Sequence, residues 1–392
     1  MDAPGLDDLD PTPAPGPLSG LLVADFSRVL AGPYATMLLG DLGATVIKVE
    51  GPGGDDTRTW QPPVRETGDG PISTYYLSIN RNKRSVVLNL ADPADRAIAA
   101  TLAQRADVLV ENFKHGGLTR FGLDYDTVRA TNPAIVYCSI TGFGTHEGAT
   151  LPGYDLLVQA VSGLMSLTGE ADGTPYRAGV AVFDVFTGLH ASNAILAALH
   201  HRDSTGAGQH LETSLLATAL STLVNQASAV VAGEVVPHRM GNAHPSLFPY
   251  EPLPTADGDL IVIAGNDNQY RRLCTAIGLP ELGTDDRFAT MAGRTARRAE
   301  LRPLLVEALA KRTKAEWFDI LTEAGVPCGP INTVAEGIDL AGRLGLAPVV
   351  DGAVPTIRNP VDYSATPPSY RLPPPALGAD SDAVRAWLEG NR

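Results

Sequence analysis

The sequence predicts an α/β fold built on a parallel sheet that helices cover on both faces. From Leu21 onward, short apolar runs rich in Val, Ile and Leu alternate with longer segments of helical period. Near-continuous apolar strands are typical of a parallel sheet buried on both faces, and their alternation with helices indicates βαβ units. A chain of 392 residues is also long enough for two or three compact domains.

The strands and helices of this first part follow one another closely. We expect strands at 21–26, 45–50, 85–90, 107–113 and 134–140, with helices at 34–43 and 93–106. The strand pattern then stops, and we expect successive helices at 154–169, 185–202 and 211–233. The second of these ends where His200, His201 and Arg202 precede Gly206, an order typical of a helix C-terminus.

A second, smaller α+β domain is expected after these helices. Two short strands surround an Asp-Gly turn within residues 247–265, and helices are expected at 268–277, 295–312 and 314–325. Short extended pieces and a final helix near 381–390 follow. We therefore expect a lead-in over 1–18, a large domain over 19–224, a small domain over 225–325 and a return to the large domain over 326–392.

Composition and charge limit the classes of function. The chain is 44% hydrophobic and 19% charged, as in a soluble globular protein, and no apolar run approaches the ~18 to 20 residues of a membrane span. The acidic, Pro-rich N-terminal stretch lacks the features of a secretory signal, so we expect a disordered lead-in and a cytoplasmic protein. A net charge of −14 argues against nonspecific nucleic-acid binding but allows a small anionic ligand at a local basic patch.

No pattern of metal or disulfide chemistry is present in the sequence. Cys138, Cys274 and Cys328 lie far apart without CxxC spacing and are expected to be buried thiols. The histidines show no HExxH or paired-ligand spacing, and there is no GxSxG elbow. We therefore expect no metal site, no tightly bound cofactor and no serine hydrolase of that type.

Asp184 is the first candidate catalytic residue. It lies directly before the expected helix at 185–202, within the apolar stretch GVAVFDVF. One interpretation is an ordinary helix N-cap, because Asp accepts hydrogen bonds from orphan backbone N–H groups. The other is a nucleophile: a carboxylate held by helix-terminal N–H groups stays ionised, and apolar neighbours limit its hydration. The residue pattern alone leaves both open.

Three further segments are candidate binding elements. Arg81, Lys83 and Arg84 cluster just before the strand at 85–90, as a solvated loop or as a seat for phosphate groups. The C-terminal end of another strand, where open parallel sheets bind ligands, is followed by Asn112, Phe113, Lys114 and Arg120. The loop GFGTHEG at 142–148 departs from the GxGxxG fingerprint of dinucleotide sites, and a glycine-rich turn near a phosphate-bearing ligand fits it better.

Six motifs in order make the chain resemble the family III CoA-transferases, also called the CaiB/BaiF family, which includes formyl-CoA transferase and the α-methylacyl-CoA racemases. The resemblance runs from Leu21 almost to the end. It is carried by VADFSRVLAGPYATMLLGDLGATVIKVEGPGGDDTR (23–58), NKRSVVLNL (82–90), DVLVENF (107–113), GYDLLVQAVSGLMSLTG (153–169), TGAGQ (205–209) and AGVPCGPIN (324–332).

The resemblance implies a role for Asp184 and a set of CoA-binding positions. Asp184 is then the nucleophile of a ping-pong CoA transfer through an acyl-aspartyl anhydride and an aspartyl-CoA thioester. The substrates are acyl-CoA and a small carboxylic acid, with dicarboxylic acids among the candidates. The CoA-binding positions of the family fall at Leu30, Ala31, Leu88, Asn89, Asn112, Phe113, Lys114, Arg120, Thr141, Gly142, Phe143 and Gly144. The family fold is a Rossmann-like large domain from both chain ends plus a small domain, in a homodimer whose subunits interlock.

Departures from the family pattern bear on the substrate. Gly51 stands where formyl-CoA transferase has a basic residue, so that phosphate contact is missing or is supplied elsewhere. The segment GNAHPSLFPY at 241–250 replaces the run of glycines of that enzyme, which argues against formate or oxalate. Tyr154 stands where the racemases have a histidine, and a tyrosine is a poor second base for α-proton exchange at neutral pH. A racemase or epimerase and a noncatalytic CoA-ester binding protein remain the alternatives to a CoA-transferase.

Overall fold

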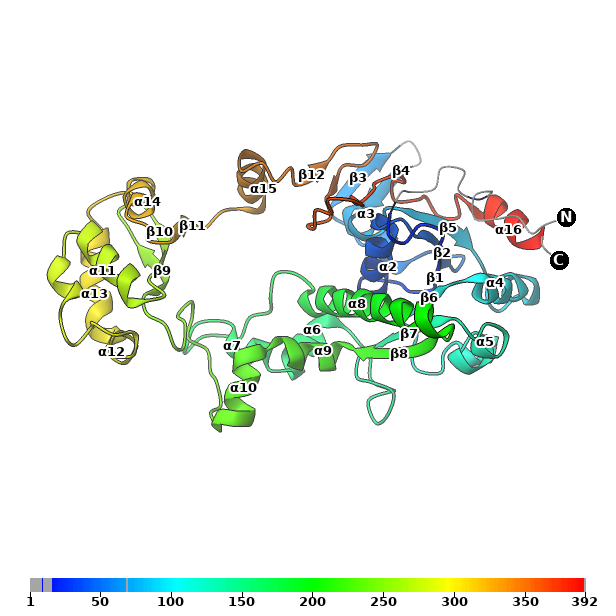
Figure 1. Cartoon of the computed structure of the whole chain (residues 1–392), viewed down its shortest axis with the longest axis horizontal. Coiled ribbons are helices and arrows are strands. Elements are labelled where there is room, and N and C mark those ends of the chain that lie inside the picture. The colour runs from blue at the N-terminus through cyan, green and yellow to red at the C-terminus, as the bar shows by residue number, and fades with distance from the viewer. Residues whose placement is uncertain (1–8, 10–15, 68–69, 391–392) are drawn as a thin grey trace. The chain divides into compact units, whose positions relative to one another are not determined.

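The computed structural model describes residue 9, residues 16–67 and residues 70–390 (Figure 1). Most of the lead-in expected over 1–18 therefore lies outside the described residues. The chain divides into two compact units: residues 1–163, 178–234 and 347–392 form the first, and residues 164–177 and 235–346 the second. The small domain was expected over 225–325. The main segment of the second unit instead runs from 235 to 346, and residues 164–177 also belong to this unit.

A six-stranded parallel sheet forms the centre of the first unit and confirms the predicted fold class. Its strands, in spatial order, are β5 (Lys83–Val87), β2 (Thr45–Glu50), β1 (Leu22–Asp25), β6 (Val108–Glu111), β7 (Val136–Thr141) and β8 (Gln209–Ser214). The sequence expectation of a helix from 211 is wrong at this point, because the chain pairs with β7 as the edge strand β8 before any helix begins.

Helices cover both faces of this sheet. On one face α4 (Pro93–Arg105), α5 (Tyr125–Thr131) and the C-terminal α16 (Ser381–Glu389) share a buried core with alternate residues of β1, β2 and β6. On the other face α2 (Ala31–Asp41) packs along α8 (Val182–Thr205) (Figure 1). Gly188 permits this close approach, since a Cβ there would lie 2.6 Å from the carbonyl oxygen of Ala31.

Shorter elements complete the first unit. They are η1 (Asp56–Thr59), β3 (Val64–Thr67), β4 (Gly70–Ser73), α3 (Thr74–Ile79), η2 (Thr119–Phe121), α6 (Asp155–Val161), α9 (Leu215–Thr222), α10 (Val224–Gly233), β12 (Val349–Val350) and β13 (Thr356–Ile357). The C-terminal segment is tied to β5 by the ion pair of Arg84 with Asp380 at 3.1 Å. Strand β5 lies at the edge of the sheet, and α16 with the residues just before it packs against this strand. This packing covers the edge.

Among the described residues, α8 is long and apolar enough, by length and composition, to cross a membrane, which the sequence analysis did not expect. It is 24 residues long, and its buried positions include Thr187, Ala191 and Ile195. These residues face the rest of the first unit, where α8 contacts α2, β7 and β8. The apolar window of α8 is 44% buried.

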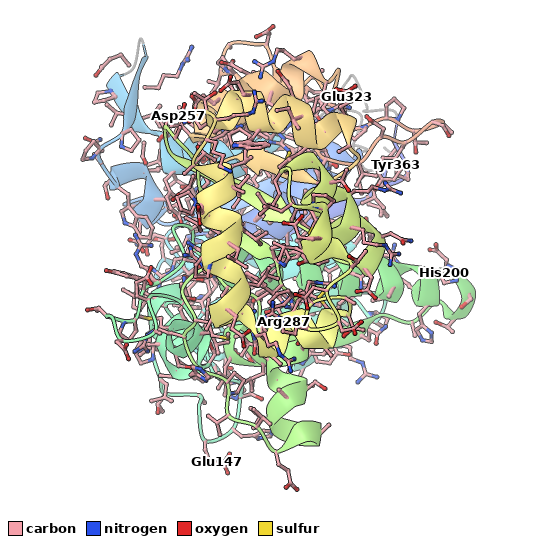
Figure 2. The ribbon with its side chains drawn as sticks, turned by 90° about the vertical axis from the view of Figure 1, so that its left-hand side faces the viewer. Glu147, His200, Asp257, Arg287, Glu323 and Tyr363 are labelled. Atoms are coloured by element: carbon pink, nitrogen blue, oxygen red, sulfur yellow. The ribbon has the colours of Figure 1, made fainter. Side chains whose placement is uncertain are left out.

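The second unit is built on an antiparallel three-stranded sheet. Its strands lie in the order β11 (Cys328–Pro330), β10 (Asp259–Ile263) and β9 (Tyr250–Pro254), and its helices are α7 (Leu164–Leu167), α11 (Asp267–Ala276), η3 (Pro280–Gly283), α12 (Met291–Ala296), α13 (Arg298–Leu309), α14 (Lys314–Glu323) and α15 (Val334–Arg343). The helix expected at 295–312 is broken at Arg297. Asp257, Arg287 and Glu323 lie on the exposed surface of this unit (Figure 2).

Candidate functional site

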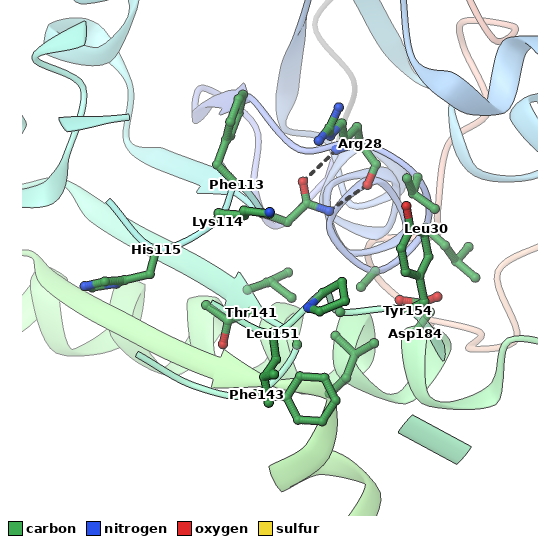
Figure 3. A pocket seen from close by; sticks show the side chains of 18 of the residues that line it. Arg28, Leu30, Phe113, Lys114, His115, Thr141, Phe143, Leu151, Tyr154 and Asp184 are labelled. Atoms are coloured by element: carbon green, nitrogen blue, oxygen red, sulfur yellow. Dashed lines mark hydrogen bonds between the residues drawn. The ribbon is translucent and has the colours of Figure 1, made fainter. Parts of the chain in front are cut away.

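A cavity of about 480 Å³ opens at the carboxyl edge of the parallel sheet in the first unit (Figure 3). The chain reaches it directly after β1, β6 and β7, and the starts of α2 and α8 complete its wall. Ligands bind at this edge in open parallel sheets because the loops after the strands converge there. The predicted site residues that line the cavity are Leu30, Ala31, Asn112, Phe113, Lys114, Thr141, Gly142, Phe143, Gly144 and Asp184.

Asp184 lies in the first turn of α8, so the interpretation of this residue as the N-cap is wrong. The cap position is held by Ala181, which has no side chain able to accept the orphan N–H groups. Asp155, the first residue of α6, accepts them instead: its Oδ1 lies 2.8 Å from the Phe183 nitrogen and 3.3 Å from the Asp184 nitrogen. The carboxylate of Asp184 is therefore free of the capping role.

The environment of Asp184 raises its pKa to about 7, first through burial and then through the negative charge of Asp155. Within the described residues, no cation or N–H group is bonded to its carboxylate. The expectation that helix N–H groups keep Asp184 ionised is thus corrected, because the capping N–H groups donate to Asp155. Near neutral pH, the ligand-free site holds both the acid and the carboxylate form of Asp184.

Gln159, one turn after Asp155 on α6, fixes the capping carboxylate. Its side-chain nitrogen donates to Oδ2 of Asp155 at 2.5 Å and to the Val180 carbonyl at 3.3 Å, while its side-chain oxygen accepts the N–H of Ala178 at 2.8 Å. Gln159 is fully buried. One amide thus ties α6 to the segment that leads into α8.

The loop between β1 and α2 is held by buried charges. Val29 has φ +69°, a left-handed conformation that is strained for a β-branched residue. Its N–H lies 3.3 Å from both carboxylate oxygens of Asp55, which also binds Lys48 Nζ at 2.9 Å. Lys48 in turn donates to the carbonyl of Ser27 at 3.0 Å. These buried contacts hold the loop in its strained conformation, and this loop brings Arg28 and Leu30 to the wall of the cavity.

A second cavity of about 340 Å³ in the first unit takes up the remaining predicted CoA-binding residues, Leu88, Asn89 and Arg120. Arg28 and Phe113 line both cavities, and the Arg28 guanidinium lies 5.9 Å from the centre of the Phe113 ring. Sequence reasoning missed Arg28. Its position within the motif VADFSRVLAGPY was the available signal, but a lone arginine there has no local pattern of its own.

The glycine-rich loop after β7 lines the first cavity, and close backbone contact explains its composition. A Cβ on Gly142 would lie 2.3 Å from the Cα of Gly153, so two backbones cross there at a distance that no side chain allows. Tyr154 follows directly, lines the same cavity and is 65% exposed (Figure 3). Trp60, another lining residue that sequence reasoning missed, packs edge-on against Tyr75 with ring centres 5.0 Å apart.

The cluster of Arg81, Lys83 and Arg84 is neither a solvated loop nor a phosphate seat. Lys83 is 1% exposed, with its Nζ 2.9 Å from Asp25, and Arg81 is 4% exposed and donates twice to Asp41. These cations form ion pairs with carboxylates inside the first unit. Over residues 16–67 and 70–390, the structure brings no three His, Cys, Asp or Glu side chains together as a metal site.

Comparison with known proteins adds a family and named relatives. Residues 18–381 match the model described as CoA-transferase family III. The chain is 45% identical over 383 residues to the succinate–glutarate CoA-transferase of Agrobacterium fabrum, covering 95% of this chain and 96% of the relative. It is 42% identical over 370 residues to the succinyl-CoA:glutarate CoA-transferase of Mus musculus, covering 92% and 84%.

The chain is also similar to a relative named for oxalate and to a solved structure. The acetyl-CoA:oxalate CoA-transferase of Acetobacter aceti is 40% identical, with 96% of each chain covered. A crystal structure of a CaiB/BaiF family protein from Brucella suis is 42% identical and superposes with a TM-score of 0.87, covering 95% of this chain and 100% of that one. These matches span both units of the fold.

Proposed function

Since the chain belongs to the family III CoA-transferases, we propose that it moves CoA from an acyl-CoA donor to a small dicarboxylic acid, with Asp184 as nucleophile. The general activity, CoA transfer to a carboxylic acid, is that of the named relatives. One observation supports the role of Asp184. Its carboxylate is unpaired and half-buried, and it lies in the wall of the cavity that most of the other candidate binding residues also line.

The proposed reaction begins with two covalent steps. An oxygen of ionised Asp184 attacks the thioester carbonyl carbon of the donor, the C–S bond breaks, and CoA leaves as a thiolate with the electron pair. The thiolate then attacks the aspartyl carbonyl of the anhydride, so the donor acid leaves as a carboxylate and Asp184 holds CoA as a thioester. Charge balances, because one anion enters and one leaves at each step.

The second half of the reaction repeats these steps with the acceptor. The acceptor carboxylate attacks the aspartyl-CoA carbonyl and releases the CoA thiolate, which then attacks the acceptor acyl carbon of the new anhydride. The products are the acceptor's CoA thioester and ionised Asp184. The anhydride intermediates hydrolyse readily in water and the aspartyl-CoA thioester hydrolyses more slowly, so the proposed route requires that the loaded cavity limit the access of water.

A dicarboxylic acceptor is proposed from two considerations. Relatives that are similar over most of their length are named for succinate, glutarate and mesaconate. The first cavity is also lined by three basic side chains, Arg28, Lys114 and His115. A second carboxylate could bind those of them that CoA leaves free. Because a relative at 40% identity is named for oxalate, the shortest dicarboxylate is also among the acceptors to test.

We also propose a cytoplasmic homodimer. Helix α10 has no buried residue in the single chain, and its Val231 is 86% exposed while Val230 is 48% exposed. A second copy of the chain is the proposed cover for this apolar surface. Light scattering after size-exclusion chromatography tests the dimer, and a monomeric mass at working concentration would contradict it.

The decisive experiment is trapping of the covalent intermediate. The purified protein is incubated with a panel of acyl-CoA esters without acceptor, and the peptide that carries Asp184 is weighed before and after hydroxylamine. We expect a hydroxylamine-sensitive adduct on wild type and none on Asp184→Asn. A protein that binds CoA without any adduct would contradict the transferase mechanism, and solvent deuterium at the α-carbon of a 2-methylacyl-CoA would then identify the racemase alternative.

A further inference from the structure

Helix α8 begins without a capping side chain of its own. Its cap position is Ala181, and the first-turn N–H groups of Phe183 and Asp184 donate to one oxygen of Asp155, which lies 28 residues earlier than Phe183 in the chain. An N-terminal helix turn with unsatisfied N–H groups is costly when it is partly buried. Asp155 is therefore the group that fixes where the turn carrying Asp184 starts.

Asp155 itself has little freedom. Its second oxygen accepts the Gln159 amide at 2.5 Å, and the same amide holds the carbonyl of Val180 and the N–H of Ala178. Since Gln159 is 0% exposed, this arrangement is enclosed by protein rather than by water. The chain from Ala178 to Asp184 is thus bound at both ends to one face of α6.

The same geometry brings two carboxylates close to each other. The negative charge of Asp155 acts on Asp184 from α6, and the pKa of Tyr75 on α3 is raised to about 12 by burial and by the charges of Asp184, Asp155 and Asp55. The other charged or titratable residues of the cavity wall are Arg28, Asp56, Lys114, His115 and Tyr154. None of these side chains, as the structure describes them, is bonded to Asp184.

We propose that Asp155 is the positioning residue of the covalent step, an inference that rests on the proposed function. Asp155 anchors the turn that presents Asp184, and its charge favours acylation of Asp184. When an oxygen of Asp184 displaces CoA from the donor carbonyl, the C–O bond forms, the C–S bond breaks and the negative charge leaves on the thiolate. Acylated Asp184 is neutral, so repulsion by Asp155 acts on the free carboxylate and disappears in both covalent intermediates.

The test separates anchoring from charge with three variants at one position. Asp155→Asn keeps an oxygen that can accept the N–H groups of Phe183 and Asp184. It removes the charge, and it replaces the oxygen that accepts the Gln159 amide N–H with an NH2 group. Asp155→Glu keeps the charge on a longer side chain, and Asp155→Ala removes both. The matched control is Asp203→Asn, which makes the same charge change on an exposed residue near the far end of α8.

The readout is the rate of adduct formation on the Asp184 peptide, followed by rapid quench and mass spectrometry from pH 5 to 9, with CoA affinity measured separately. In wild type the rate is expected to rise through a midpoint near pH 7, because the carboxylate is the reactive form. For Asp155→Asn we expect a lower midpoint, with a rate at pH 8.5 reduced by roughly threefold to tenfold. For Asp155→Ala we expect a loss on the order of 100-fold.

The outcomes distinguish this inference from the proposed function. An unchanged midpoint and an unchanged rate in Asp155→Asn, with wild type forming the adduct, overturn the role of Asp155 and leave the transferase mechanism standing. Absence of the adduct in wild type overturns both. The inference is supported if the pH midpoint of adduct formation falls in Asp155→Asn but stays high in Asp155→Glu and in Asp203→Asn. CoA affinity must also stay within about twofold of wild type.

Discussion

Asn112 holds Arg28 through its backbone: the side-chain oxygen of Asn112 accepts the N–H of Arg28 at 3.0 Å, and its nitrogen donates to the Arg28 carbonyl at 2.7 Å (Figure 3). A residue predicted to bind CoA thus joins the end of β6 to the loop after β1. Replacement Asn112→Ala removes both bonds and is expected to cost about 1 to 2 kcal/mol of unfolding free energy. Urea denaturation measures this.

The same variant is also expected to change substrate binding. Because the loop that Asn112 holds carries Arg28, Val29 and Leu30 into the first cavity, KM for the acyl-CoA donor should rise about tenfold while kcat changes less. Replacement Asn132→Ala, which removes an amide that bonds to backbone carbonyls elsewhere in the first unit, provides the matched control for stability. Equal KM values in the two variants would contradict a positioning role for Asn112.

Arg28 is expected to bind a phosphate group of CoA. Its side chain is exposed, lines both cavities and has Asp56 as a neighbour at 3.6 Å, a weak pairing that a phosphate can displace. Replacement Arg28→Ala should raise KM for acyl-CoA by about tenfold or more, since a hydrogen bond to a charged group contributes about 1.5 to 3 kcal/mol. Steady-state kinetics with Arg343→Ala, an exposed arginine of the second unit, is the control.

Truncated donors identify the phosphate that Arg28 contacts. If Arg28 contacts the diphosphate, the loss in Arg28→Ala appears with acyl-CoA and acyl-3′-dephospho-CoA and vanishes with an acyl-pantetheine thioester. If it contacts the 3′-phosphate, only full acyl-CoA shows the loss. The same loss with the pantetheine thioester, which has no phosphate, would show that Arg28 acts by another route.

The carboxyl of Asp184 is expected to lower stability at neutral and alkaline pH. Its pKa of about 7 in the folded chain exceeds the value of about 3.9 expected when unfolded, so folding is penalised as pH rises from about 4 to 7 and fully penalised above 7. Asp184→Asn removes this penalty and should raise the unfolding free energy by about 2 kcal/mol at pH 8.5. The gain should disappear at pH 4; a gain independent of pH would contradict the titration.

Lys83 is expected to support folding rather than CoA binding. It is fully enclosed with Asp25, and desolvation by burial lowers its pKa to about 8 against the opposing charge of Asp25. Lys83→Met leaves the Asp25 carboxylate buried without this partner and should cost about 3 kcal/mol of unfolding free energy. Thermal melts should show little change for the exposed Lys311→Met, and CoA affinity of folded Lys83→Met should match wild type.

The core strands of the sheet were predictable because their signal is local. β1, β2, β5, β6 and β7 are short apolar runs between helical segments, and each is found within a few residues of its expected place. β8 was missed because an edge strand is only half covered: its sequence QHLETS is mostly polar, with only its last residue buried, and does not form a continuous apolar run. Its pairing with β7 is a tertiary contact.

The sequence by itself determined the α/β class, the strand pattern, the family motifs and the choice of Asp184 as the candidate nucleophile, since each depends on residues that are near one another in the chain. Only the tertiary structure decided the environments. It paired Arg81, Lys83 and Arg84 with carboxylates 40, 58 and 296 residues away, brought Arg28 to the wall shared by two cavities, and placed Asp155 at the start of α8. Burial and charge contacts of this kind depend on which distant segments of the chain come into contact. Local sequence patterns do not predict those contacts.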